Sequence, residues 1–331
     1  MKRWLVNFLG WTLALALLAG GVAGWWLHQP LHGQGPNLEL AIEPGTSPRA
    51  VAQAVVRAGA TVSETWLYQW FRWSGESRKI RAGNYEIAPG MTPRQLLSML
   101  VRGEESLITL TLVEGWSFRQ IRQMLSKAEH IKSETQGLSD ESVMNILGRP
   151  GVPAEGRFFP DTYSVAKGSS DLALLRRAMH AMDRQLDSAW AQRQTGLPLK
   201  SATEALILAS IVEKETGRAA DRPLIAGVFI NRLHQGMMLQ TDPTVIYGLG
   251  ERFDGNLRKR DLQTDTPWNT YTRFGLPPTP IAMPGRAALL AAVQPASTRA
   301  LYFVAKGDGS SHFSETLTEH NRAVQKYQRG S

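Results

Sequence analysis

Two glutamates, Glu213 and Glu215, lie at the end of a stretch of chain that is otherwise almost wholly apolar, within residues 201–250. A carboxylate on a buried surface is costly to keep ionised, so its pKa tends to rise unless a cation compensates for the charge. A carboxyl group with a raised pKa is suited to donate a proton and then to accept one. This stretch therefore predicts acid/base chemistry at the end of a buried helix.

Helix geometry separates the two acids. At about 100° per residue, Glu215 continues an apolar ridge that contains Leu208 and Ile211. Glu213 falls about 160° away around the helix, closer to the polar strip that includes Ser210. The pattern favours Glu215 as the residue with the altered pKa.

A simpler interpretation of the same spacing needs no chemistry. Glutamates are common near helix ends, and Lys214 and Arg218 are adjacent cations that could pair with both acids in solvent. Helical periodicity alone does not exclude this, so the choice depends on the rest of the chain.

Composition narrows the class of protein. With 331 residues, of which 43% are hydrophobic, the chain can bury a large core in more than one domain. Its net charge of +8 fits an anionic partner such as a membrane surface or an acidic glycan. The positive charge is dispersed, which argues against nucleic acid as a partner. The absence of cysteine excludes disulfides, thiolate metal sites and a cysteine nucleophile.

The N-terminus predicts a membrane anchor. Residues 4–27 carry no charged side chain, which is long enough to span a bilayer. Lys2 and Arg3 precede this span, and Trp25 and Trp26 stand at its far edge, so the N-terminus is expected in the cytoplasm and the remaining chain outside. A cleaved signal peptide is the alternative, but the apolar stretch is long for one.

A repeated pattern follows a Gly- and Pro-rich linker at residues 28–37. Residues 42–49 and 87–94 each read as a strand end, a glycine turn, a capping Ser47 or Thr92 and a proline that opens an amphipathic helix. A looser copy begins at Val113. With a helix from Glu64 to Trp73 between the first two copies, residues 38–104 predict a small α+β module similar to LysM peptidoglycan-binding modules. Its aromatic residues at helical spacing are expected to form core; they are Trp66, Tyr68, Trp70 and Trp73.

The remaining residues, 105–331, predict a larger α+β domain, which places the whole chain in the α+β class. Residues 106–115 alternate as a strand, residues 155–163 suggest a shaped loop, and residues 171–194 predict an amphipathic helix. Glu319 and His320 are adjacent and would point to different sides of a helix, so no metal site is expected there.

Several segments of this domain together resemble the endolytic murein transglycosylase family, the YceG-like lytic transglycosylases of bacterial inner membranes. The matching segments are EGRFFPDTY, LASIVEKET, VFINRL, LQTDPTVIYG, NTYTRFGLPP, PIAMPG and LYFVA. In that family the essential acid is the second glutamate of the SI-[IV]-E-K-E segment, which is Glu215 here. Trp268 stands where relatives commonly have tyrosine, so a role for that hydroxyl does not carry over.

The resemblance implies a reaction that cuts the β-1,4 bond between N-acetylmuramic acid and N-acetylglucosamine. The 6-hydroxyl of the muramic acid attacks its own anomeric carbon, so one carboxyl group serves as acid and then as base, with no cofactor and no metal. Further residues are expected to bind sugar groups or to orient Glu215; they are Asn231, Gln240, Asp242, Tyr247, Asn269 and Tyr271. The implied partners are glycan strands, the membrane and peptidoglycan synthases.

Two alternatives remain open on the sequence. The protein could be a membrane-tethered glycan-binding or divisome scaffold without catalysis. It could also be a hydrolytic muramidase, which needs a second carboxylate such as Glu213 or Asp242 to activate water.

Overall fold

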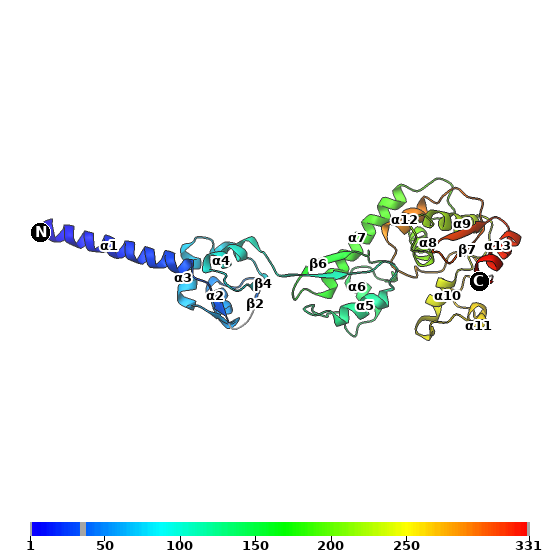
Figure 1. Ribbon diagram of the computed structural model, residues 1–331. Coiled ribbons are helices and arrows are strands. Elements are labelled where there is room, and N and C mark those ends of the chain that lie inside the picture. The colour runs from blue at the N-terminus through cyan, green and yellow to red at the C-terminus, as the bar shows by residue number, and fades with distance from the viewer. Residues whose placement is uncertain (1, 34–37, 330–331) are drawn as a thin grey trace. The chain divides into compact units, whose positions relative to one another are not determined.

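The structure is a computed structural model that describes residues 2–33 and 38–329 (Figure 1). Its α-helices are α1 (Lys2–Leu27), α2 (Pro48–Arg57), α3 (Glu64–Trp73), α4 (Pro93–Arg102), α5 (Phe118–Lys127), α6 (Asp140–Ile146), α7 (Asp171–Ala191), α8 (Ala202–Glu215), α9 (Arg222–His234), α10 (Asp242–Leu249), α11 (Lys259–Gln263), α12 (Arg286–Val293) and α13 (Leu317–Val324). Its strands are β1 (His32–Gly33), β2 (Leu38–Ile42), β3 (Ala60–Thr61), β4 (Gly83–Ile87), β5 (Leu107–Thr111), β6 (Thr162–Ala166), β7 (Tyr302–Ala305) and β8 (Ser311–Ser314). This mixture confirms the predicted α+β class.

The chain folds as two compact units. Unit 1 comprises residues 1–108 and 164–168, and unit 2 comprises residues 109–163 and 169–331. The strands form two-stranded sheets that join β1 with β3, β2 with β4, β5 with β6, and β7 with β8. The division assigns α1 and the first two repeated segments to unit 1, and the looser copy from Val113 and the glutamate-bearing helix to unit 2.

Helix α1 is the one element, among the described residues, that is long and apolar enough to cross a membrane, over Phe8–Leu27. The residues from Phe8 to Val22 are all exposed, so this part of the helix buries little of its apolar surface against the protein.

The rest of unit 1 packs helices on a short antiparallel sheet. In β2, Leu38, Leu40 and Ile42 are buried while the residues between them are exposed, and Leu40 lies opposite Tyr85 of β4. The side chains of Ser47 and Thr92 accept the N–H groups of Ala50 and Gln95, which confirms both as helix caps. The core is formed by Leu40, Val51, Val55, Leu67, Phe71, Tyr85, Leu96 and Leu100. The LysM-like identity of residues 38–104 remains a prediction.

Two predictions about unit 1 need correction. Trp66 and Trp73 are 48% and 75% exposed and do not build the core. Leu67 and Phe71 fill that place, because they lie one turn apart on the inner face of α3 while the tryptophans share a neighbouring face. The predicted linker also contains β1, which pairs with β3, and its residues 34–37 lie outside the described part of the chain.

Unit 2 is built around α8. Helices α7, α9 and α12 all pack against it (Figure 1), and the residues from Ala205 to Val212 are all buried. The buried Ser210 is satisfied, since its hydroxyl donates to the Ile207 carbonyl and accepts the Ile281 N–H. The hairpin of β7 and β8 packs with α13. The tight helical layer around α8 fixes the position of its last turn.

Candidate active site

Glu215 is the last residue of α8, because the backbone of Thr216 turns to an extended conformation with φ −152° and ψ 134°. The hydroxyl of Thr241 donates a hydrogen bond to Oε1 of Glu215. Burial raises the pKa of Glu215 to about 7. The Thr241 hydrogen bond opposes this rise, Asp242 adds to it, and Arg232 lowers it. A carboxyl group in this state can hold or release a proton near neutral pH.

A pocket of about 540 Å³ opens beside Glu215. Of the residues predicted for the site, Gln240, Asp242 and Tyr271 line it together with Glu215. Its remaining walls include Arg232, Leu239, Thr241, Tyr302, Phe303, Val304 and His320. No group of three or more acidic or histidine side chains within residues 2–33 and 38–329 could hold a metal ion. The pocket therefore offers one carboxyl group with a raised pKa among hydroxyls, aromatic rings and an arginine.

Buried threonines hold Thr241 in place. The hydroxyl of Thr270 accepts the Thr241 N–H at 3.0 Å, and Thr244 donates its hydroxyl to the Thr241 carbonyl at 2.7 Å. All of these threonines are less than 5% exposed. The preceding residue, Gln240, has a φ of 48°, which turns the chain into this network. The donor to Glu215 is thus fixed by its own backbone contacts.

Asp242 and Tyr271 form a second polar pair on the pocket wall. The Tyr271 hydroxyl donates to Oδ1 of Asp242 at 2.6 Å. Burial and the neighbouring Asp242 both raise the pKa of Tyr271 above its usual range, so the phenol stays protonated.

Arg232 is a residue of the site for which the sequence suggested no role. It is 7% exposed, and its guanidinium donates to the carbonyls of Leu239 and Leu301 at 2.8 and 2.7 Å. Its charge also lies 5.1 Å from the centre of the Tyr302 ring. Arg232 therefore links α9 to the residue that precedes β7 and to the loop that leads into Thr241. The signal available in the sequence was an arginine that follows the apolar run from Leu224 to Ile230.

Asn231 and Asn269 are absent from the described residues that line the Glu215 pocket. The amide nitrogen of Asn231 donates to the carbonyls of Thr298 and Ala300 at 2.8 and 3.0 Å. The amide nitrogen of Asn269, which is fully buried, donates to the carbonyls of Leu262 and Thr264 at 3.0 and 2.7 Å. Both side chains hold backbone segments in place.

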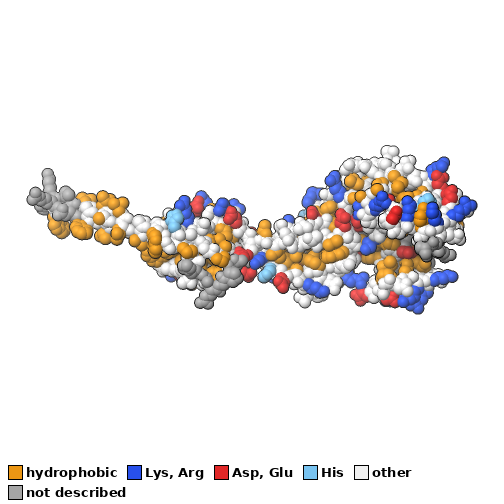
Figure 2. Space-filling model, in the orientation of Figure 1, with side chains coloured by type: hydrophobic (Ala, Val, Ile, Leu, Met, Phe, Trp, Pro, Cys, Tyr) orange, Lys and Arg blue, Asp and Glu red, His pale blue; other side chains and the backbone are white. Residues whose placement is uncertain are grey.

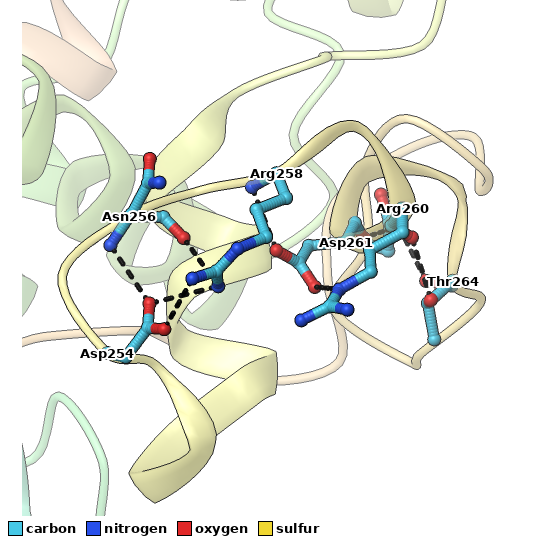
Figure 3. Close-up of polar contacts among 7 residues, drawn as sticks. Asp254, Asn256, Arg258, Arg260, Asp261 and Thr264 are labelled. Carbon is cyan, nitrogen blue, oxygen red and sulfur yellow. Dashed lines mark hydrogen bonds and ion pairs between the residues drawn. The ribbon is translucent and has the colours of Figure 1, made fainter.

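The segment held by Asn269 follows α10 and is drawn in Figure 3. Asp254 accepts from both terminal nitrogens of Arg258 at 3.1 and 2.7 Å, and Asp261 accepts the Arg258 N–H at 2.8 Å. Because the Asp254–Arg258 pair is exposed, it shapes the loop and contributes little stability.

Glu213 differs from its predicted setting. Its side chain is 6% exposed and pairs with Arg222, whose Nη2 lies 3.4 Å from Oε1. The Gly285 N–H donates to the other carboxylate oxygen at 3.0 Å. The expectation of a solvated acid beside Lys214 and Arg218 is therefore wrong, because α9 and the start of α12 close over this side of α8. Burial raises the pKa of Glu213, although both partners oppose the rise.

A further buried carboxyl group, Glu155, was not predicted for the site from the sequence. The N–H of Phe118, at the start of α5, donates to both oxygens of Glu155 at 3.0 and 3.2 Å. Burial raises the pKa of Glu155 to about 7, and hydrogen bonds from Phe118 and Tyr247 oppose this rise. The available signal was an acid that opens the aromatic segment at residues 155–163.

Glu155 and Tyr247 line a separate groove of about 380 Å³ with Trp268 and Thr279. The Tyr247 and Trp268 rings meet nearly edge to face, with centroids 5.5 Å apart. The Trp268 indole donates to the Thr279 hydroxyl at 2.9 Å. Tyr247, predicted for the site, thus lies in this groove at one end of α10, whereas Asp242 at the other end lines the Glu215 pocket.

Comparison with known proteins identifies the family. Residues 40–326 match the model of the YceG-like family. A Bacillus subtilis (strain 168) protein named endolytic murein transglycosylase is 32% identical, over 88% of this chain and 85% of the relative. A protein of the same name from Streptococcus pneumoniae serotype 2 (strain D39 / NCTC 7466) is 27% identical, and the match covers 99% of this chain but 65% of that relative.

A solved structure agrees with these matches. The crystal structure of a YceG-like protein from Listeria monocytogenes superposes with a TM-score of 0.54 at 28% sequence identity, covering 87% of this chain and 98% of that one. Because the family model spans most of the chain and the Bacillus relative exceeds 30% identity, this protein belongs to the YceG-like family.

Proposed function

We propose that this protein is a membrane-anchored lytic transglycosylase that cuts the MurNAc–GlcNAc β-1,4 bond within peptidoglycan strands. The single observation that carries the proposal is the carboxyl group of Glu215, with a pKa of about 7, at the wall of an open pocket. The names of the curated relatives support the substrate and the endolytic cleavage.

In the proposed reaction Glu215 acts twice. Its proton passes to the glycosidic oxygen of the leaving N-acetylglucosamine as the bond to the anomeric carbon breaks. The 6-hydroxyl of the muramic acid then forms the new bond to that carbon, and the Glu215 carboxylate takes the hydroxyl proton. The product carries a 1,6-anhydro end, and Glu215 is protonated again. An internal nucleophile removes the need for a second carboxyl group.

The neighbours of Glu215 suit this double role. Thr241 occupies Oε1, which leaves Oε2 as the oxygen that exchanges the proton with the sugar. Burial favours the protonated form before the reaction, and the Thr241 hydroxyl and Arg232 favour the ionised form after it. Gln240, Asp242 and Tyr271 are the proposed contacts to sugar hydroxyls and acetamides from the same pocket.

The proposed location follows from α1. Helix α1 would anchor the chain in the bacterial inner membrane with its N-terminus in the cytoplasm, because basic residues precede the apolar span. Unit 2 would then act outside the cytoplasm, where peptidoglycan lies and where synthases that extend glycan strands would be its partners.

Digestion of purified sacculi by the full chain in detergent tests the proposal. We expect soluble fragments whose muramic ends are lighter by one water than hydrolysed ends, as read by mass spectrometry. Glu215→Gln should abolish their release, whereas Glu129→Gln, at an exposed glutamate of the same unit, should release them at the wild-type rate. Release by Glu215→Gln at the wild-type rate would refute the acid/base role.

A hydrolytic muramidase is the second candidate, and one observation favours it. Asp242 lines the same pocket as Glu215 and could serve as the second carboxylate that hydrolysis requires. Its Oδ1 is occupied by the Tyr271 hydroxyl. Fragments with hydrated reducing ends, lost in Asp242→Asn, would favour this candidate over the transglycosylase.

A further inference from the structure

The aromatic face of α3 lies against the apolar helix α1 within unit 1. The Trp26 and Trp66 rings have centroids 5.7 Å apart and a tilt of 56° between their planes. Trp66, Trp70 and Trp73 follow one stripe of α3, on which Trp66 is about half exposed and Trp73 is largely exposed. This stripe has no role in the candidate active site, because all residues of that site belong to unit 2.

A groove of about 330 Å³ runs between the two helices. On the α1 side it is lined by Ala19, Ala23, Trp26 and Leu27, and on the α3 side by Thr65, Trp66, Gln69, Trp70 and Trp73. Figure 2 shows hydrophobic side chains that continue from α1 onto the adjoining surface of unit 1. An apolar surface of this kind, left open in water, marks a contact with another apolar phase.

The position of the groove along α1 determines its depth in a bilayer. Ala19 precedes Leu27 by about two helical turns, or about 12 Å along the helix axis. The headgroup region of one leaflet is only about 5–8 Å thick. If Leu27 stands at the membrane surface, the wall formed by Ala19 and Ala23 reaches below the headgroups, and the α3 residues that share the groove lie at the interface.

From this depth we infer that α3 is a membrane-contact helix. Its exposed Trp66 and Trp73 insert into the interface of the same leaflet from which α1 emerges, and lipid chains fill the groove. The inference rests on the proposed anchoring by α1. Tryptophan is enriched at this depth, because its ring is apolar and its N–H is polar. The module in unit 1 would then be held on the bilayer by two helices, which limits its tilt relative to the membrane.

Spin labels on the full chain in zwitterionic lipid vesicles test the contact. The chain has no cysteine, so each introduced cysteine gives a unique site. Thr65→Cys and Gln69→Cys place labels in the groove and keep every tryptophan. Leu17→Cys on α1 is the lipid reference, and Asp187→Cys, exposed on α7, is the water reference.

At each position the collision rate of the spin label with oxygen, which dissolves in lipid, is compared with its collision rate with a water-soluble nickel complex. The ratio of the two rates is the oxygen preference of that label. We expect the oxygen preference at positions 65 and 69 to approach that at Leu17 and to exceed that at Asp187. In a Trp66→Ser, Trp73→Ser background the preference at position 65 should shift toward the water reference.

Three results would overturn the inference. A lipid-like signal at Leu17 with water-like signals at positions 65 and 69 would refute it while leaving the anchor intact. A water-like signal at Leu17 would refute the anchor as well. Dipolar broadening between labels at position 65 that disappears on dilution with unlabelled chain would show that a second copy fills the groove. None of these results depends on the activity of Glu215.

Discussion

The proton affinity of Glu215 reflects contacts that act in opposite directions. Burial at the end of α8 favours the neutral form, and the nearby Asp242 acts in the same direction. The Thr241 hydroxyl and Arg232 favour the ionised form. The result is a pKa of about 7, so both forms are populated near neutral pH. This balance suits the proposed role of Glu215, in which it gives and then takes one proton.

Replacing Thr241 with valine should shift that balance. The variant loses the donor that lowers the pKa of Glu215, so the carboxyl group stays protonated to higher pH. The basic limb of the pH–rate profile should therefore move to higher pH. A hydrogen bond to a charged group is worth about 1.5–3 kcal/mol, so the maximal rate should fall by roughly 10- to 100-fold.

The measurement is anhydro-product release from sacculi across pH. Thr241→Ser keeps the hydroxyl and should retain the wild-type profile. A basic limb of Thr241→Val that stays in place or moves to lower pH would contradict this account of the Glu215 pKa.

The Glu213–Arg222 ion pair is expected to affect the stability of the fold. Both side chains of the Glu213–Arg222 pair are largely buried, so Arg222→Met leaves an unpaired carboxylate in the interior. The expected cost is about 3 kcal/mol in the free energy of unfolding. Because burial raises the pKa of Glu213, the acid protonates as pH falls, and the loss should shrink toward acidic pH.

Thermal unfolding of the detergent-solubilised protein at pH 5 and pH 8 measures this difference. The matched control is the double variant Glu213→Gln, Arg222→Met, which carries neither charge and should show little dependence of its deficit on pH. If Arg222→Met lowered the melting temperature equally at both pH values, Glu213 would not be an unpaired charge in that variant.

Only part of the site can be predicted from local sequence patterns. Helical periodicity places Glu215 on an apolar ridge, because that pattern is encoded within one helix. The burial of Glu213 depends on Gly285, which lies 72 residues away in the chain. Glu155 likewise depends on Phe118, 37 residues away, and on Tyr247. Contacts at such separation leave no periodic trace, so these two acids could not be placed from the sequence.

At the scale of elements, helix starts were the most predictable feature. Ser47 and Thr92 each cap a helix at the expected residue, and Ser117 in the looser copy caps α5, since the cap and the first turn are adjacent in sequence. The outward face of α3 was not predictable from its own residues. Trp66 and Trp73 turn away from the core because Leu67 and Phe71 fill the core and α1 supplies an apolar neighbour.

Asn231 illustrates how one element positions another. Its amide joins α9 to the segment before β7 through the carbonyls of Thr298 and Ala300. Asn231→Ala leaves these carbonyls without their donor, which should cost about 1–3 kcal/mol of stability. Asn231→Asp has the same size but cannot donate, so it should lower the melting temperature at least as far.

Thermal unfolding and steady-state kinetics on soluble glycan strands together check this role. We expect a lower melting temperature with little change in KM at a temperature where the variant is folded. An unchanged melting temperature with a raised KM would instead support the sequence prediction that Asn231 contacts the glycan.

On the scale of the whole molecule, the proposed membrane contact and the proposed chemistry belong to different units. Helix α1 and the aromatic face of α3 lie in unit 1, while the Glu215 pocket and the Glu155 groove lie in unit 2. None of the described residues that line either cavity comes from unit 1. Removal of the anchor should therefore leave the chemistry of unit 2 unchanged.

A chain that begins at His28 tests this separation. Without α1 it should be extracted from the membrane pellet by alkaline carbonate, which leaves the full chain in the pellet, because the one apolar span among the described residues is gone and α3 makes only an interfacial contact. Its release of anhydro ends from purified sacculi, per mole of folded protein, should match that of the full chain in detergent. In cells the same truncation should still reduce cleavage, since the span that is proposed to place unit 2 outside the cytoplasm is gone. Loss of activity on purified sacculi, with an unchanged melting transition of unit 2, would mean that α1 contributes to catalysis directly and that the two units do not act independently.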